Sequence, residues 1–418
     1  MSPSQLRPRH SRAANAVPGR RHKPDYWLLI LSAVLLVIGL IVIYAISPGV
    51  TAQQSVSSNY YVSRQLLAIV LGVGAFLVVA NTPLMWWRKA EKPLLMASAA
   101  AVVVVRLFGE RINGAYRWIQ LGGFSFQPAE LVKFTLIVAL AGFLTDRLRR
   151  GELEDSKKTL RPLLIVLATI AVIIAGLESD LGSTAVMVAI MAAMIFVIGL
   201  PIKRLMMILG IIVVGATLLI MSSGYRRQRL VTFLHPTSDC LSTGYQACQA
   251  LITVGSGGMF GLGLGRSVQA YGYLPEAAND SIFAIFAEKF GFVGVSVLLG
   301  LFVALFSRLK NIMERAPNTY TRLIVAGILA WLSTQTIINV GAMIGLLPLK
   351  GITLPFISYG GTSLVFVTAA LGLAFQISRY TSYGPLTNMQ DEEEGTHYGN
   401  STDRRRLRGA YHPAPSGR

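Results

Sequence analysis

One acidic residue ends a long polar connection and stands directly before an apolar run. Asp280 closes the segment 222–280, and the run Ile282–Phe306 follows it. A carboxylate held at a membrane surface can act as a general base, whereas an aspartate just before a helix is most simply its N-cap residue. Glu288 lies a little over two helical turns further along. The sequence leaves both interpretations of Asp280 open.

Several cations are expected on the same side of the membrane as Asp280. Arginine binds phosphate oxygens through two parallel hydrogen bonds, and lysine supplies a point charge. A carboxylate beside such cations at a lipid surface suits chemistry on a lipid diphosphate. The cations are Arg111, Arg117, Arg226, Arg227, Arg229, Arg266 and Lys350.

Two further polar pairs lie at the start of an apolar run or within one, and an ionisable group in a membrane is a candidate functional residue. Glu130 and Lys133 are three residues apart and share a helix face, so they can pair, either as a structural ion pair or as part of a site. Gln335 and Asn339 are four apart and are expected to form hydrogen bonds between helices rather than to bind a ligand.

A short turn, GLESDLGST, carries two more carboxylates, Glu178 and Asp180. Its simplest interpretation is an exposed turn whose Asp180 caps the helix that follows.

The composition determines which elements must position these residues. Hydrophobic residues make up 53% of the 418 and charged residues only 14%, against about 25% charged in soluble domains. This excludes a soluble globule and predicts an all-α membrane protein with ten spanning helices. The apolar runs are Tyr26–Ser47, Leu66–Ala80, Leu94–Val105, Leu131–Leu144, Leu163–Leu177, Ala185–Leu200, Leu205–Met221, Ile282–Phe306, Leu323–Leu347 and Leu364–Ser378.

The orientation follows from lysine and arginine. With ten spans both termini share one side, and most basic residues fall in the two tails and in the segments 82–93, 147–162, 201–204 and 307–322. The positive-inside rule makes that side cytoplasmic. The net charge of +18 is therefore mainly a topology signal, with lipid headgroups as an added partner for the tails and no nucleic acid expected.

The domains predicted from this layout are a disordered basic tail over residues 1–24, a ten-helix membrane domain over 25–381 and a disordered tail over 382–418. The long external loop, 222–280, lies between the seventh and eighth helices and is expected to be ordered and partly helical.

That loop has two features of its own. Its glycine run, Gly255–Gly265, lacks nucleotide-binding spacing and favours a close approach of backbone to a helix or ligand. Cys240 and Cys248 are too few for a cysteine scaffold, and their spacing does not determine whether they form a disulfide.

The same residues resemble motifs of the SEDS family, membrane glycosyltransferases that polymerise peptidoglycan from lipid II. The similarity spreads over about 250 residues in the family's order, and nearly the whole chain fits the family's ten-helix layout. The motifs are NGAYRWIQLGGFSFQPAELVKF (113–134), ESDLGST (178–184), GYQACQALITVGSGGMFGLGLGRS, LPEAANDSIFAIFAEKFGFVG (274–294) and GLLPLKGITLPFISYGGTS (345–363).

The resemblance implies a role for each matching position. Asp280 corresponds to an essential aspartate that activates the attacking sugar hydroxyl directly or through a divalent cation, Mg²⁺ or Mn²⁺. The implied substrate-binding residues are Glu130, Lys133, Arg117, Trp118, Arg229, Lys350, Ser358 and Glu288.

Within the family, the segment KGITLP resembles the division branch, FtsW, more than the elongation branch, RodA. Three positions depart from the family pattern: Ser281 replaces a usual Phe, Lys289 a common Glu, and Glu178-Ser179 a usual Gln-Pro. These departures affect the charge of the predicted cavity and leave the aspartate intact.

The implied reaction joins lipid II to an undecaprenyl-diphosphate-linked glycan through a β-1,4 bond at the outer face of the bacterial cytoplasmic membrane, at the septum. The implied partners are a class B penicillin-binding transpeptidase and division-complex proteins. Two rival functions are a lipid II flippase, which should show inverted repeats or broken midplane helices, and a scaffold, which needs no carboxylate in a cavity.

Overall fold

The structure is a computed structural model. It describes residues 23–54, 57, 59–112, 115–121, 124–170, 172–174, 180–221, 224–234, 240–242, 244–267 and 269–380. The predicted tails lie outside these residues, apart from the boundary positions 23 and 24.

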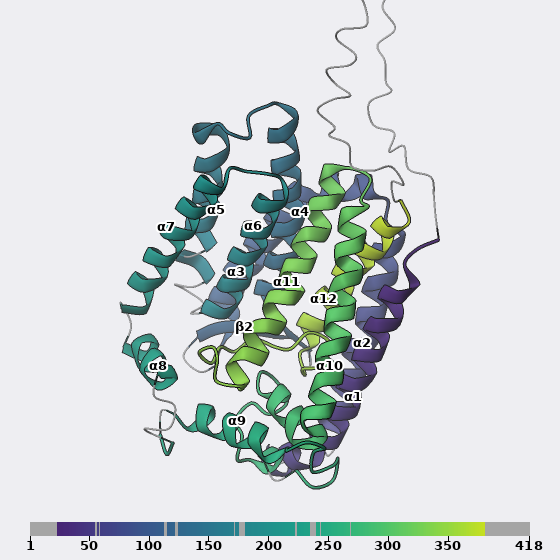
Figure 1. Cartoon of the computed structure of the whole chain (residues 1–418), viewed down its shortest axis with the longest axis vertical. Helices are drawn as coiled ribbons and strands as arrows, with labels where there is room; N and C mark the ends of the chain where they lie inside the picture. Colours follow the sequence, from purple (N-terminus) through teal and green to yellow (C-terminus); the bar gives the residue numbers. More distant parts are fainter. Residues whose placement is uncertain are drawn as a thin grey trace, which may run out of the picture. The chain divides into compact units, whose positions relative to one another are not determined.

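Long apolar helices form the body of the described chain (Figure 1). Six of them are long and apolar enough to cross a bilayer, and four further helices occupy the remaining predicted runs. The six are α1 (Tyr26–Gln54), α2 (Tyr60–Asn81), α4 (Pro128–Arg149), α10 (Ile282–Glu314), α11 (Thr319–Met343) and α12 (Gly361–Ser378), and the four are α3 (Leu84–Phe108), α5 (Arg161–Ile170), α6 (Leu181–Val197) and α7 (Ile202–Met221).

Helix α3 begins earlier than its apolar residues predict. The segment 82–93 was expected to be a connection because it is basic, yet helix α3 runs from Leu84. Arg88 is ion-paired with Asp146 of α4 and lies 3.3 Å from Glu91 in its own helix. The helix therefore includes the basic segment, with Arg88 close to carboxylates of both α3 and α4.

A small antiparallel sheet corrects the purely helical prediction. Strands β1 (Glu110–Ile112), β2 (Ala115–Leu121) and β3 (Phe124–Phe126) pair in sequence order between α3 and α4. In the sequence, Asn-Gly (113–114) and Gly-Gly (122–123) separate the strands, and such dipeptides are strong hairpin signals. The sheet carries the predicted Arg117-Trp118 pair on β2.

The core is built around α11, which contacts α4, α6, α9, α10 and α12. Its Trp331 is fully buried. Helices α2 and α12 pack closely through small residues, because Phe76 of α2 covers Gly372 of α12, and Thr368 covers Gly72 in return. Such small-residue contacts are a usual way for membrane helices to associate.

The predicted loop 222–280 is partly helical, as expected. It contains α8 (Gly224–Leu234), α9 (Tyr245–Ser256) and the short helix η3 (Gln269–Tyr271). Helices α8 and α9 lie at one end of the bundle, and the connection between α4 and α5, which includes η1 (Ser156–Leu160), lies at the other (Figure 1).

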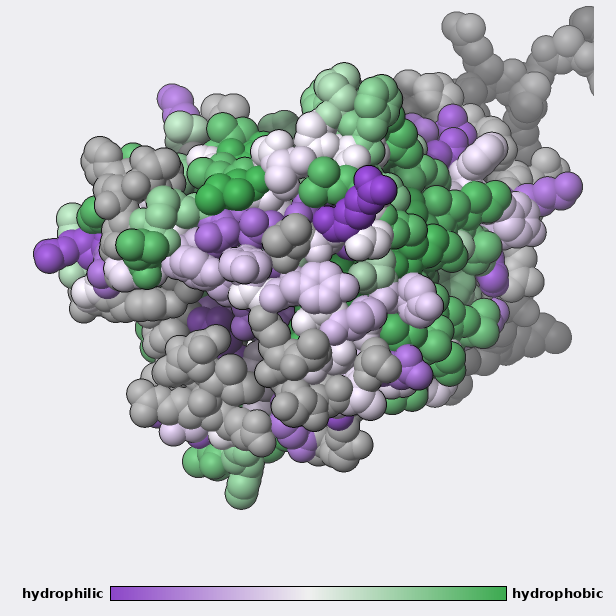
Figure 2. Space-filling model, turned by 90° about the horizontal axis from the view of Figure 1, so that it is seen from below, coloured by the Kyte–Doolittle hydropathy of each residue, from purple (hydrophilic) through white to green (hydrophobic). Residues whose placement is uncertain are grey.

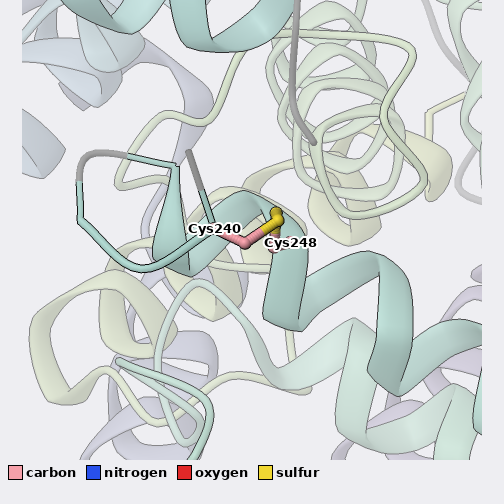
Figure 3. Close-up of a disulfide and its surroundings, with 2 residues drawn as sticks. All are labelled: Cys240 and Cys248. Carbon is pink, nitrogen blue, oxygen red and sulfur yellow. A yellow bond between two sulfur atoms is a disulfide. The ribbon is translucent and has the colours of Figure 1, made fainter. Parts of the chain in front are cut away.

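The two cysteines form a disulfide, which the sequence left open. The Cα atoms of Cys240 and Cys248 are 5.6 Å apart. The bond joins the chain after α8 to the first turns of α9 (Figure 3).

Candidate functional site

Asp280 is the last loop residue before α10, and it is not the N-cap. Ser281 occupies the N-cap position, and its side chain makes no capping hydrogen bond. The N-cap interpretation of Asp280 is therefore wrong. The Asp280 side chain is half-buried, and its surroundings point to a different role.

The carboxylate of Asp280 and the guanidinium of Arg117 converge on Gly351. A β-carbon at Gly351 would lie 3.8 Å from Asp280 Oδ2 and 3.9 Å from Arg117 Nη1. Lys350 precedes this glycine and is half-buried. Three segments far apart in sequence thus bring one carboxylate and one predicted phosphate-binding cation to Gly351, and a second predicted cation, Lys350, directly precedes this glycine.

Asn339 of α11 holds two of these segments in place. Its amide nitrogen donates to the main-chain oxygens of Asp280 and Ile352, both at 2.7 Å. Asn339 is 1% exposed, and its Oδ1 has no hydrogen-bond partner among the described residues. The predicted hydrogen bond between helices holds for Gln335, which accepts from Lys133 of α4, whereas Asn339 bonds to two loops and not to another helix.

The turn 358–361 is hydrogen-bonded to the end of the long loop, directly before Asp280. The Ser358 hydroxyl donates to Asn279 O at 2.6 Å and accepts from Leu354 N at 2.7 Å. Tyr359 N donates to Ala278 O at 2.8 Å. Ser358 was predicted to bind substrate, and in this structure its hydroxyl links the protein's own loops.

Glu130 and Lys133 form the predicted ion pair. Lys133 Nζ lies 2.7 Å from Glu130 Oε1 and donates to Gln335 Oε1 at 3.3 Å. The two charged residues are 3% and 1% exposed. Gln335 Nε2 donates in turn to Thr353 O at 2.9 Å, so this network connects α4 and α11 to the loop that contains Gly351.

Glu288 faces the glycine-rich part of the long loop. Its carboxylate accepts hydrogen bonds from Ser267 Oγ and, at 3.4 Å, from Gln269 N. The neighbouring Lys289 donates from Nζ to Leu264 O at 2.7 Å. The predicted substrate role of Glu288 stays a prediction.

Of the other predicted residues, the structure describes Trp118 and Asp180. Trp118 is half-buried on β2, where it pairs with Glu110 of β1. Asp180 caps α6 as predicted, accepting from Ser183 N at 2.9 Å, but it is buried and not exposed as expected. The side chain of Arg229, on α8, and the whole of Glu178 lie outside the described residues.

The loop that contains Gly351 reaches back into the bundle. Gly39 lies near the middle of α1, and the carbonyl of Phe356 occupies the place where its β-carbon would be. The segment 350–358 therefore lies beside the helices rather than beyond their ends. Figure 2 views the α8–α9 end and shows hydrophilic side chains around a depression, with apolar surface beside them.

Sequence reasoning missed Gly351 as a site residue. The signal was its place in the motif KGITLP, but its role comes from the approach of two charged side chains from other elements. A β-carbon at this position would be in van der Waals contact with both the carboxylate and the guanidinium.

Comparison with known proteins identifies the family. The FtsW/RodA/SpoVE family, described as "Cell cycle protein", matches residues 26–383. Stage V sporulation protein E of Bacillus subtilis is 37% identical over 366 residues, covering 87% of this chain and 99% of the relative. The chain belongs to the FtsW/RodA/SpoVE family. This is the SEDS family of the sequence prediction, and the chain is a multi-pass membrane protein.

Other relatives show which branch the chain resembles. The probable peptidoglycan glycosyltransferase FtsW of Coxiella burnetii is 37% identical over 362 residues, covering 85% of this chain and 96% of that protein. The FtsW-like character predicted from the sequence is confirmed.

Two solved structures share the family's fold with this chain. A chain from a peptidoglycan synthase complex that coordinates polymerization and crosslinking matches with a TM-score of 0.72 and 28% identity, over 85% of this chain and 98% of that one. The rod shape determining protein RodA of Thermus thermophilus matches with a TM-score of 0.63 and 28% identity, over 85% and 97%.

The site offers few protein ligands for a metal ion. No group of three or more His, Cys, Asp or Glu side chains that could hold a metal occurs in the described part of the chain. A magnesium ion needs only one or two carboxylates when substrate phosphates complete its coordination. Asp280 therefore fits such a cation only if the oxygens of a bound diphosphate supply further ligands.

Proposed function

We propose that this chain is a peptidoglycan glycosyltransferase that polymerises lipid II during cell division. The observation that carries the proposal is the convergence of Asp280 and Arg117 on Gly351, beside Lys350. A carboxylate that shares a glycine contact with a guanidinium, with a lysine next in sequence, would provide a base and a diphosphate-binding group in one place. The relatives named probable peptidoglycan glycosyltransferase support the same activity.

In the proposed reaction Asp280 accepts the proton of the GlcNAc 4-hydroxyl on one lipid II. The oxygen attacks C1 of the MurNAc at the reducing end of a second lipid-linked chain, and undecaprenyl diphosphate leaves with the bonding electron pair. A single displacement inverts the α-linked donor to a β-1,4 bond. Arg117 and Lys350 stabilise the negative charge that develops on the leaving diphosphate.

Arg229, Trp118, Glu288 and the pair Glu130–Lys133 complete the proposed substrate-binding set. The pair is buried, so we propose that it acts through Gln335 and Thr353 on the loop that contains Gly351. A bound Mg²⁺ or Mn²⁺ would be held by Asp280 together with diphosphate oxygens, where it would add positive charge to the leaving group.

The proposed topology has ten spans, with both termini in the cytoplasm and α8 and α9 outside. In this arrangement Asp280 lies in the outer half of the bilayer, where lipid II is presented at the septum. A class B penicillin-binding transpeptidase is the proposed partner. The similarity to a chain of a synthase complex that couples polymerization to crosslinking supports this choice.

The RodA neighbours favour one second candidate, an elongation polymerase with the same chemistry. The two roles differ in where the protein acts. Depletion that produces filaments without septa supports the division role, and rounding of the cells supports elongation.

Asp280→Ala tests the activity directly. The purified variant, with its transpeptidase, should retain its thermal transition and its affinity for lipid II but form no glycan from labelled lipid II. Asp280→Asn should behave the same way, because it keeps the shape and removes the base. Normal polymer length from either variant would refute the assignment, and lipid II transfer between leaflets by both would favour a flippase.

A further inference from the structure

Helix α10 is interrupted near its start. Gly291 has φ 63° and ψ −167°, inside an otherwise helical span. Such a break leaves main-chain N–H and C=O groups without their helical partners, and at membrane depth each unpaired group is costly. Other parts of the chain must therefore supply hydrogen bonds at this point.

The glycine-rich segment 257–264 supplies them. Leu262 N donates to Glu288 O at 2.9 Å and Gly263 N to Lys289 O at 3.0 Å. In the other direction, Phe292 N donates to Gly258 O at 2.9 Å and Val293 N to Met259 O at 3.1 Å. The segment and the broken helix thus satisfy each other's main-chain groups.

The side chains of this segment point away from the protein. Met259 is 58% exposed and Phe260 81%, and the neighbouring Phe292 of α10 is 64% exposed. Between Gly255 and Leu274 the sequence has a single charged residue, Arg266. An exposed surface of this kind, with its main chain already paired, suits contact with hydrocarbon.

The position along α10 gives the depth of this surface. Arg308, which is paired with Asp25 at 2.6 Å, marks the far end of the apolar part of the helix. Phe292 is 16 residues from it, about 24 Å along the helix axis, which is less than the ~30 Å of the hydrocarbon core. The exposed Val297 and Val303 continue the same helix toward Arg308.

We propose that residues 257–264 form a membrane-embedded loop, with Met259 and Phe260 inserted among lipid acyl chains on the α8–α9 side of the bilayer. The loop extends the lipid-facing surface of α10 and clamps the helix break. Because Lys289 and Glu288 bind Leu264 and Ser267, lipid contact on the loop stabilises the part of α10 that begins beside Asp280.

Spin labelling of the full-length chain tests the proposal. Phe260→Cys is labelled with a nitroxide and reconstituted into phosphatidylcholine/phosphatidylglycerol nanodiscs. Two matched positions serve as references: Val297→Cys on the exposed face of α10, and Glu154→Cys in the exposed, charged connection after α4. Under non-reducing conditions the disulfide keeps Cys240 and Cys248 from reacting.

Collision rates with oxygen and with nickel-EDDA give the result. Position 260 should resemble position 297, with an oxygen-to-nickel ratio severalfold higher than that of position 154. A ratio like that of position 154 would place the loop in water and overturn the proposal. Low access to both reagents would show a protein occupant, such as a second copy of the chain, and would also overturn it. The measurement requires no glycan synthesis, so its outcome is independent of the proposed activity.

Discussion

Asn339 is a buried amide that connects two loops of the proposed site. Its two hydrogen bonds reach the main chain of Asp280 and of Ile352, so it sets the distance between the carboxylate and the cation-bearing loop. Displacements of about 1 Å in such an arrangement can cost about 10²-fold in rate.

Replacing this amide should lower the turnover rate more than the affinity for lipid II. Asn339→Asp keeps the shape but replaces the donating nitrogen with an oxygen that faces both carbonyls, and we expect kcat to fall by about 10–100-fold with little change in KM. Steady-state glycan synthesis over a range of lipid II concentrations measures both.

Thr336→Val is the matched control, since Thr336 is buried on the same helix and its hydroxyl bonds only to Leu332 O among the described groups. It should change kcat by less than about threefold, consistent with a hydrogen bond worth about 1 kcal/mol or less. Equal effects of the two substitutions would contradict a positioning role for Asn339.

The buried pair of Glu130 and Lys133 should behave as a coupled unit. Lys133→Met leaves a buried carboxylate without its partner, and we expect a loss of about 3–5 kcal/mol of stability. Adding Glu130→Gln to the same variant removes that charge and should restore most of the loss. Thermal unfolding in lipid-containing detergent measures both variants, and additive losses would show that the pair is not coupled.

At the scale of elements, the glycine run packs against α10 where this helix is interrupted. Gly261 and Gly263 have φ angles of 80° and 87°. Only at Gly261 would a β-carbon collide with the main chain of Lys289, because Gly263 has open space. A side chain at Gly263 would therefore meet only the strain of a positive φ, whereas a side chain at Gly261 would meet that strain and a collision with Lys289.

Gly261→Ala should destabilise the protein more than Gly263→Ala. Both substitutions strain the left-handed backbone by about 1 kcal/mol, and Gly261→Ala must also displace the loop from α10. Hydrogen exchange at Leu262 and Phe292 should rise markedly for Gly261→Ala and only slightly for Gly263→Ala. Equal exchange in the two variants would contradict the inference that the loop stabilises the interrupted part of α10.

The disulfide of the long loop is expected to act locally. It closes a loop of nine residues at the start of α9, and a loop of this length limits the unfolded chain by about 2–3 kcal/mol. The double variant Cys240→Ser/Cys248→Ser should show faster exchange in α9 and unchanged exchange in α11. Unchanged exchange in α9 would show that the surrounding packing already fixes this helix.

At the scale of the whole molecule, the uneven distribution of lysine and arginine predicts which end of the bundle faces the cytoplasm. Glu154 lies in an exposed basic connection at one end, and Tyr273 is 52% exposed in the loop at the other. In intact spheroplasts a membrane-impermeant maleimide should label Tyr273→Cys and not Glu154→Cys, and permeabilisation should expose both. The reverse pattern would overturn the proposed topology.

The sequence by itself determined the class of the protein and the chemistry of its residues. The apolar runs locate the helices of the bundle but not all of their ends: α1 continues to Gln54 and α10 to Glu314, and α3 begins ten residues before its apolar run, at Leu84. The motifs indicated Asp280, the cations and the Glu130–Lys133 pair, because unpaired charge is costly in a membrane and each such residue stands out.

Only the tertiary structure decided what these residues do together. Asp280, Arg117 and Gly351 come from three separate segments, and Ser281 rather than Asp280 occupies the N-cap position of α10. Asn339 and Ser358 became braces of the site because their partners are main-chain groups of distant loops. Such contacts depend on how the re-entrant segment 350–358 packs against α1 and α11, and local sequence patterns contain no information about that packing.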